Sequence, residues 1–294
     1  MNTVLITDNN CDLPQWYVNQ NQLMVLPFNF RIKDREYTAT RDPENPDYLD
    51  SHEFYEMLRQ GEVATTAQIN VQTFLDAFRP ILEQGKDILY LAFSSGLSGT
   101  CQSAMTAAQM LGEEFPERKI RVVDSLSASL GQGLLAYKAV EMQKAGATGD
   151  EIEAWLNENK LKVHHWFTVD DLNCLKRGGR VSATAAFLGT MLSIKPVLNM
   201  DDEGHLIPKE KTQGRKRALK ALVDKMEANC SDPKSTPIFI SHGDCADDCA
   251  LVARMIEQRF GVKVDITNTI TPVVGAHSGP GTLALFFIGD KPRG

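Results

Sequence analysis

The sequence predicts an α/β protein: a parallel-sheet N-terminal domain with helices on both faces, followed by a second α/β domain with a mixed sheet. Up to about residue 160, short apolar runs typical of buried strands alternate with helix-forming segments, and the connections are long enough to join parallel strands. Farther along, a turn at residues 201–204 joins two extended segments and indicates a hairpin. We therefore expect domains at residues 1–160 and 161–294.

In the first domain, apolar and alternating runs predict strands at residues 4–7, 24–32, 87–93 and 119–125. Helices are predicted to begin near Pro14 and to cover residues 53–58, 71–83, 101–111 and 138–144. The ligands of such sheets gather at the carboxyl ends of the strands, which places Ser95 and Asp124 at one edge.

In the second domain, strands are expected at residues 163–169, 192–198, 206–208, 237–241, 262–267 and 282–288. A helix through residue 155 leads into this part, and further helices are expected at 214–228 and 247–260. Residues 175–182 read as a basic turn with two glycines, and residues 274–281 as a glycine-rich loop.

Composition narrows the class of protein. With 294 residues, 43% hydrophobic and 7% aromatic, the chain is typical of a folded water-soluble protein. Its net charge of -7 argues against a nucleic-acid or anionic-membrane surface. No apolar run approaches the roughly 20 residues of a membrane span, and the first residues lack the features of a signal peptide, so we expect a cytoplasmic location. The six cysteines lack zinc-site spacing and are expected to be free thiols without a metal.

The turn after the strand at 87–93 holds three serines, two glycines and a threonine at residues 94–100. A strand-to-helix turn leaves backbone N–H groups without partners at the positive end of the helix dipole, a favourable place for an anion. Gly96 allows close approach of a ligand, and Ser94 and Ser95 can donate hydrogen bonds. Taken alone, the same residues also fit a simple helix cap.

Polar side chains elsewhere could complete a carboxylate clamp. Thr66 lies in a second hydroxyl cluster, while Arg180 and His277 lie in glycine-bordered turns. A hydroxyl can donate to a carboxylate, an arginine supplies the opposite charge, and a histidine can donate or change protonation. The alternative is a serine hydrolase with Ser95 as nucleophile, His277 as base and Asp124 as orienting group, although the G-x-S-x-G elbow is absent.

Neither a phosphate-binding loop nor a set of kinase motifs is present in the sequence, so the chain is expected to carry no nucleotide site and no cofactor. Gly131 and Gly133 resemble part of a dinucleotide fingerprint, but several residues separate them from the preceding strand. We therefore do not assign nucleotide binding to them.

Six short motifs are spread over nearly the whole chain. They are Ile-Thr-Asp at 6–8 with Asp-Leu-Pro at 12–14, Ser-Ser-Gly-Leu-Ser-Gly-Thr at 94–100, Val-Asp-Ser at 123–125 with 127–131, Leu-Lys-Arg-Gly-Gly-Arg-Val-Ser at 175–182, Lys-Pro at 195–196, and Gly-Ala-His-Ser-Gly-Pro-Gly at 275–281. In this order and spacing the chain resembles the DegV family of bacterial lipid-binding proteins, which includes the fatty-acid-binding subunit of fatty acid kinase.

The resemblance implies a protein that is not itself an enzyme and that holds one long-chain fatty acid in a tunnel between its two domains. In the family a threonine and a serine, matching Thr66 and Ser95, meet the carboxyl group, and the loop arginine and histidine match Arg180 and His277. Ser94 and Gly96 belong to the same serine motif, while Ser98 and Thr100 are expected to hold the turn. The implied function is a carrier that presents the carboxyl group to an ATP-using fatty acid kinase subunit, which forms the acyl phosphate.

Two positions depart from the family pattern. Residues 66–69 read Thr-Ala-Gln-Ile where many members have Thr-Ser-Gln-Pro, which keeps the threonine but loses one hydroxyl and a rigid proline. Gln213 stands where members that serve the kinase tend to carry an arginine, and glutamine cannot replace its charge. A lipid-responsive binding protein without a kinase partner is therefore the alternative, and a serine-dependent lipid ester hydrolase is a third.

Overall fold

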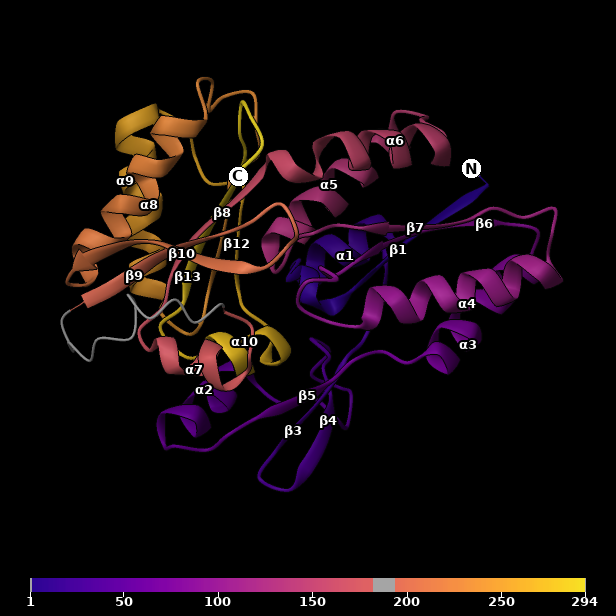
Figure 1. Cartoon of the computed structure of the whole chain (residues 1–294), viewed down its shortest axis with the longest axis horizontal. Helices are drawn as coiled ribbons and strands as arrows, with labels where there is room; N and C mark the ends of the chain where they lie inside the picture. The colour runs from indigo at the N-terminus through magenta and orange to yellow at the C-terminus, as the bar shows by residue number, and fades with distance from the viewer. Residues whose placement is uncertain (1, 182–193, 294) are drawn as a thin grey trace.

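The computed structural model describes residues 2–181 and 194–293, and in it two main sheets lie side by side (Figure 1). The N-terminal sheet is parallel, with strand order β2-β1-β6-β7. Its strands are β1 (Thr3–Asp8), β2 (Met24–Leu26), β6 (Asp87–Ala92) and β7 (Ile120–Asp124). The predicted parallel sheet is confirmed.

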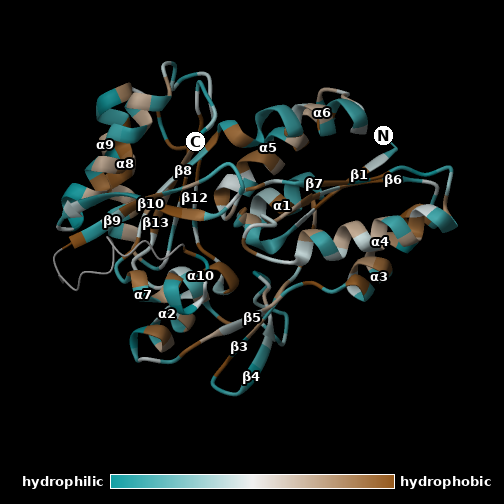
Figure 2. Cartoon of the chain, in the orientation of Figure 1, coloured by the Kyte–Doolittle hydropathy of each residue, from teal (hydrophilic) through white to brown (hydrophobic). Residues whose placement is uncertain are grey.

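Helices cover both faces of this sheet, as expected. Alternate residues of each strand enter different cores, because side chains in a strand point to opposite faces: Leu89 packs in one core and Tyr90 in the other. The first face carries α1 (Gln15–Asn21), α5 (Leu130–Lys144) and α6 (Gly149–Asn159). The second carries α3 (Val71–Glu83) and α4 (Thr100–Glu114). Figure 2 shows the hydrophobic colour concentrated in the strands between these helices.

The second main sheet has the order β10-β9-β8-β13-β11-β12 and is mixed, because β11 and β12 pair in parallel and its other neighbouring strands pair antiparallel. Its strands are β8 (Val163–Thr168), β9 (Ile194–Met200), β10 (Leu206–Gln213), β11 (Phe239–His242), β12 (Ile266–Thr269) and β13 (Leu283–Ile288). The long helices α8 (Arg215–Asn229) and α9 (Ala246–Phe260) cover its outer face. The predicted mixed sheet and hairpin are confirmed.

A small antiparallel sheet with the order β4-β3-β5 was not predicted. It consists of β3 (Asn29–Ile32), β4 (Arg35–Thr38) and β5 (Thr65–Ala67), and α2 (Ser51–Arg59) lies beside it. The single strand predicted at residues 24–32 is wrong, because β2 ends before Pro27, which has no N–H to donate to a sheet. Asp50 caps α2 by accepting hydrogen bonds from the first backbone N–H groups of that helix.

Three other local predictions need correction. The glycine-rich segment at 274–281 is not all loop: α10 (Pro272–Ser278) begins on a proline and ends at Gly279, whose φ is 79°. The turn predicted at 175–182 begins too early, because residues 175–177 belong to α7 (Leu172–Arg177). Its last residue, Ser182, lies outside the described residues together with residues 192–193 of the predicted strand. Helix α5 begins at Leu130 rather than near residue 138. The described residues also form two short 3-10 turns, η1 (Asn9–Cys11) and η2 (Lys160–Lys162).

Helix α5 packs against both main sheets, and one continuous core reaches from Leu5 in β1 to Phe286 in β13. Two glycines in its first turn make this possible. A Cβ atom at Gly131 would lie 2.0 Å from Nε2 of His165, and one at Gly133 would lie 2.4 Å from the carbonyl oxygen of Cys11. These glycines are therefore packing positions between the sheets.

Candidate ligand-binding site

A cavity of ≈ 470 Å³ lies where the carboxyl end of the parallel sheet faces the mixed sheet. The loops after β1, β6 and β7 supply one wall, and β8, β13 and α10 supply the other. Large apolar side chains dominate the lining: Phe28, Phe93, Phe167, Met200, Val273 and Phe286. The volume lies in the range of small-molecule sites, and the lining suits an apolar ligand.

Three of the predicted site residues meet at one part of this cavity. Thr66 from β5 and His277 from α10 are joined by a hydrogen bond of 2.8 Å between Oγ1 and Nε2, although they are 211 positions apart. Arg180, also in the lining, donates from Nε to the carbonyl oxygen of Leu97 at 3.3 Å and from Nη1 to that of Gly178. A Cβ atom at Gly178 would lie 2.4 Å from Nδ1 of His277, so only glycine lets the two segments come this close.

The protonation of these groups follows from burial. Removal from water lowers the pKa of His277 to about 4, and the positive charge of Arg180 adds to the effect. The imidazole is therefore neutral at pH 7, and Arg180 is the cation of this group. An apolar cavity with hydroxyl, imidazole and guanidinium groups at one place is suited to a ligand with a long apolar part and an acidic head.

The other three predicted site residues, Ser94, Ser95 and Gly96, lie outside the cavity lining. Ser94 is fully buried and donates to the carbonyl oxygen of Gly204 at 2.8 Å, and it accepts a hydrogen bond from the N–H of Gly96. Ser95 is exposed, and its N–H donates to Oδ1 of Asp124 at 3.2 Å. Among the described residues, the cavity lining includes none of these three; the same turn contributes Leu97, Ser98 and Gly99 instead.

Ser98 holds the turn through contacts with Thr100, as expected. Its hydroxyl lies 3.0 Å from that of Thr100 and accepts a hydrogen bond from the Thr100 N–H. The constellation needed for a serine hydrolase is not brought together: within residues 2–181 and 194–293, no hydrogen bond joins Ser95 to His277.

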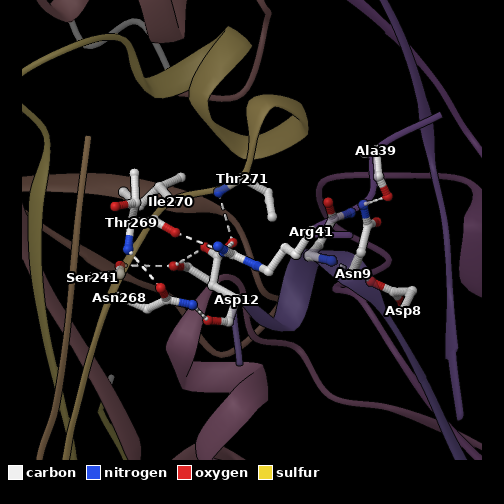
Figure 3. A network of polar contacts seen from close by, with 12 residues as sticks. Asp8, Asn9, Asp12, Ala39, Arg41, Ser241, Asn268, Thr269, Ile270 and Thr271 are labelled. Carbon is white, nitrogen blue, oxygen red and sulfur yellow. Dashed lines mark hydrogen bonds and ion pairs between the residues drawn. The ribbon is translucent and has the colours of Figure 1, made fainter. Parts of the chain in front are cut away.

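Beneath the cavity, a fully buried carboxylate joins the two halves of the chain (Figure 3). Asp12, in the loop after β1, has a left-handed backbone with φ of 52°. Its Oδ1 accepts the N–H of Thr271 at 2.8 Å and lies 3.4 Å from Nη2 of Arg41, which also donates to the carbonyl oxygen of Thr269 at 2.7 Å. Ser129, a cavity residue, donates to Oδ2. Burial raises the pKa of Asp12 in spite of Arg41.

A second cavity, of ≈ 600 Å³, shares Thr66, Arg180 and His277 with the first. Its other lining residues include charged side chains such as Arg59, Arg177, Asp170, Asp171 and Asp244. We call it the outer cavity and the first one the inner cavity. The three shared residues therefore lie where an apolar and a polar cavity meet.

In the described part of the chain, one group of side chains is close enough to hold a metal ion: His52, Glu56 and Asp244. Arg59 already pairs with both carboxylates, at 2.5 Å each, so this group reads as an ion-pair cluster. The six cysteines, all within the described residues, are free. No described helix has the length and apolar character needed to cross a membrane.

The fold and the site together define an α/β protein that encloses an apolar ligand cavity between a parallel and a mixed sheet. The model of the DegV family of uncharacterised proteins matches residues 2–290. The chain belongs to the DegV family. It is 44% identical, over 98% of its length and 97% of the relative's, to a DegV domain-containing protein of Clostridium perfringens.

Solved structures of relatives have the same fold over their whole length. A DegV lipid-binding protein of Thermotoga maritima superposes with a TM-score of 0.86 at 28% identity, covering 100% of both chains. A fatty-acid-binding DegV family protein of Thermus thermophilus gives a TM-score of 0.86 at 30% identity, covering 98% of this chain and 100% of its own. Both relatives are thus described by the lipid class that they bind.

Proposed function

We propose that this protein binds one long-chain fatty acid, with the acyl chain in the inner cavity and the carboxylate beside Thr66, Arg180 and His277. The proposal rests on one observation: the lining of an apolar cavity includes the guanidinium group of Arg180, the hydroxyl of Thr66 and the neutral imidazole of His277. Burial of an acyl chain contributes roughly 0.8 kcal/mol per methylene before the costs of association. The fatty-acid-binding relative from Thermus thermophilus supports the same ligand class.

The residues of the turn after β6 have different roles in this proposal. Ser94 and Gly96 hold the turn against Gly204, and Ser95 is tied through its backbone to Asp124, so the turn presents Leu97 and Ser98 to the ligand. The division at residues 1–160 and 161–294 then separates the carboxyl edge of the parallel sheet from the opposing wall. We propose these as the two domains between which the ligand lies.

We further propose that the protein is a carrier that serves in the cytoplasm and presents the carboxyl group to an ATP-using kinase subunit. Thr66, Arg180 and His277 line both cavities, so a carboxylate beside them can be approached from the outer cavity while the chain stays buried. In this scheme the partner supplies nucleotide and chemistry, and this chain supplies binding and orientation.

Gln213 favours a second candidate, a lipid-responsive binding protein without a kinase partner. Its side chain is exposed at the end of β10 and accepts a hydrogen bond from Nη1 of Arg217 at 3.3 Å. A neutral amide at this position supplies no charge for a phosphate-bearing partner.

The first test is extraction of the purified protein into organic solvent, followed by mass spectrometry of the extract. One fatty acid per chain is the expected result, whereas protein that contains no lipid and takes up none when offered fatty acid would refute the proposal. Incubation with a fatty acid kinase subunit and ATP, with hydroxylamine to trap acyl phosphate, then separates the two candidates. Trapped product supports the carrier, and its absence with lipid-loaded protein supports the second candidate.

A further inference from the structure

One side chain that lines the inner cavity, that of Asn10, has polar atoms with which a purely apolar acyl chain could form no hydrogen bond. Asn10 lies in η1, directly after β1, and is fully buried. Within the described chain, neither its amide nitrogen nor its amide oxygen has a hydrogen-bond partner, and the residue is part of the cavity lining. Buried amides are nearly always paired, because an unpaired donor or acceptor loses its hydration without compensation.

The neighbours of Asn10 are engaged by the protein itself. The side chain of Asn9 donates to the carbonyl oxygen of Ala39 at 2.9 Å (Figure 3). It also accepts the N–H of Phe28 at 3.1 Å. Asp8 accepts from Tyr90 at 2.8 Å, and Asp12 accepts from Thr271 at 2.8 Å. Three polar side chains around Asn10 are therefore structural, and the Asn10 amide stands apart from their networks.

A second unpaired group lies in the same lining. The hydroxyl of Ser278, at the end of α10, has no partner among the described residues, and Ser278 is only 6% exposed. Both residues are more deeply buried than Thr66, Arg180 and His277, which are partly exposed. The inner cavity thus offers hydrogen-bonding groups in addition to the three proposed for the carboxylate.

We infer that Asn10 is a specificity-determining residue that binds an oxygen substituent on the acyl chain, so the preferred ligand is a hydroxylated long-chain fatty acid. A hydroxyl both donates and accepts, and it can therefore pair with either atom of the amide, whereas a plain methylene chain leaves both unpaired. A site built to bond a hydroxyl discriminates against the analogue that lacks it. This inference rests on the proposed fatty-acid binding and specifies its substrate class.

The experiment compares octadecanoic acid with a series of hydroxyoctadecanoic acids that differ in the position of the hydroxyl. Dissociation constants are measured by displacement of a fluorescent fatty acid from the wild type and from Asn10→Leu, which replaces the amide by an apolar group of similar size. For at least one isomer we expect the wild type to prefer the hydroxy acid by about tenfold, and we expect Asn10→Leu to abolish that preference. Octadecanoic acid should bind to Asn10→Leu as tightly as to the wild type, or more tightly.

Asn10→Ala is the second variant, because it removes the amide without adding bulk and covers the case in which leucine does not fit. Ser278→Ala tests whether the serine shares the hydroxyl. A wild-type preference below about twofold for every isomer overturns the inference, as does a preference that survives in both Asn10 variants. Failure of the wild type to bind any of these acids, octadecanoic acid included, would instead refute the proposed function.

Discussion

Replacement of Arg180 by methionine tests the charge at the proposed carboxylate site. Methionine keeps an apolar stem of similar length but removes the guanidinium group. Arg180 is held by the carbonyl oxygens of Leu97 and Gly178, so its position is fixed by the protein. A hydrogen bond to a charged group contributes about 1.5–3 kcal/mol, and the partial exposure of Arg180 favours the lower part of this range. We expect Arg180→Met to weaken fatty-acid binding by roughly 10- to 30-fold.

The assay is displacement of a fluorescent fatty acid, with the corresponding fatty alcohol measured in parallel. Loss of the hydrogen bond to Leu97 could also loosen the wall of the cavity, and that effect would weaken acid and alcohol alike. The charge effect weakens the acid alone. Arg177→Met is the matched control, since Arg177 is exposed and lines the outer cavity but not the inner one.

The pH dependence of the same variant provides a second test. Burial is the main cause that lowers the pKa of His277 and the charge of Arg180 adds to it, so removal of that charge raises the pKa part of the way toward the ordinary value. In Arg180→Met, acid should therefore protonate His277 at a higher pH than in the wild type and recover part of the lost affinity. Equal weakening of acid and alcohol, or acid binding within about twofold of the wild type, would refute the role given to Arg180.

Three further substitutions test the site and the fold. Thr66→Val removes the hydroxyl that contacts His277 and should weaken fatty-acid binding by about 5- to 10-fold in the same displacement assay, whereas Thr65→Val, at the exposed neighbour, should not. Gly131→Ala places a Cβ atom against the opposite sheet and should lower the free energy of unfolding in urea by about 1–3 kcal/mol, whereas Gly112→Ala, which meets nothing within 4 Å, should not destabilise the protein. Burial lowers the pKa of His164 to about 4 from its ordinary 6.5, so the unfolded chain takes up the proton first and stability falls as pH drops from 6.5 toward 4. His164→Gln should remove up to ~3 kcal/mol of that fall, and an unchanged pH profile of urea unfolding would contradict the assignment.

The sequence predicts the fold best where burial is uniform. Strand β6 is recognisable because residues 88–91 are all apolar and all buried between two helical layers, and α3 is predicted at its observed bounds. Composition misleads where glycine has a packing role. The glycines at 275–281 suggest a loop, yet Gly275 lies inside α10. Glycine is needed there because a Cβ atom would come within 2.5 Å of the Tyr55 hydroxyl. That contact is made by a residue 220 positions away, and no local pattern encodes it.

The candidate site shows a similar limit. Side-chain chemistry and the family resemblance both point to Thr66, Arg180 and His277, and the structure brings them together. The sequence does not indicate which serine of the turn at residues 94–100 lines the cavity. Ser98 and not Ser95 lines the cavity, and the Ser95 N–H is bonded to Asp124, a tertiary contact 29 positions away in the chain. Asn10 gave no signal in the sequence, because a polar residue in a loop is ordinarily exposed.

The proposed carrier role has an electrostatic consequence for the product. With His277 neutral at pH 7, Arg180 is the cation at the junction of the two cavities, and it matches a single carboxylate. Conversion to an acyl phosphate adds negative charge and bulk, which the apolar inner cavity cannot take up, so the phosphoryl group must lie in the outer cavity. There Arg59 is already paired with Glu56 and Asp244, Asp170 is paired with Lys195 and Arg215, and Arg177 lines the same cavity. In the proposed scheme the phosphoryl group therefore lies in the cavity that Arg177 lines, with Arg180 at the junction.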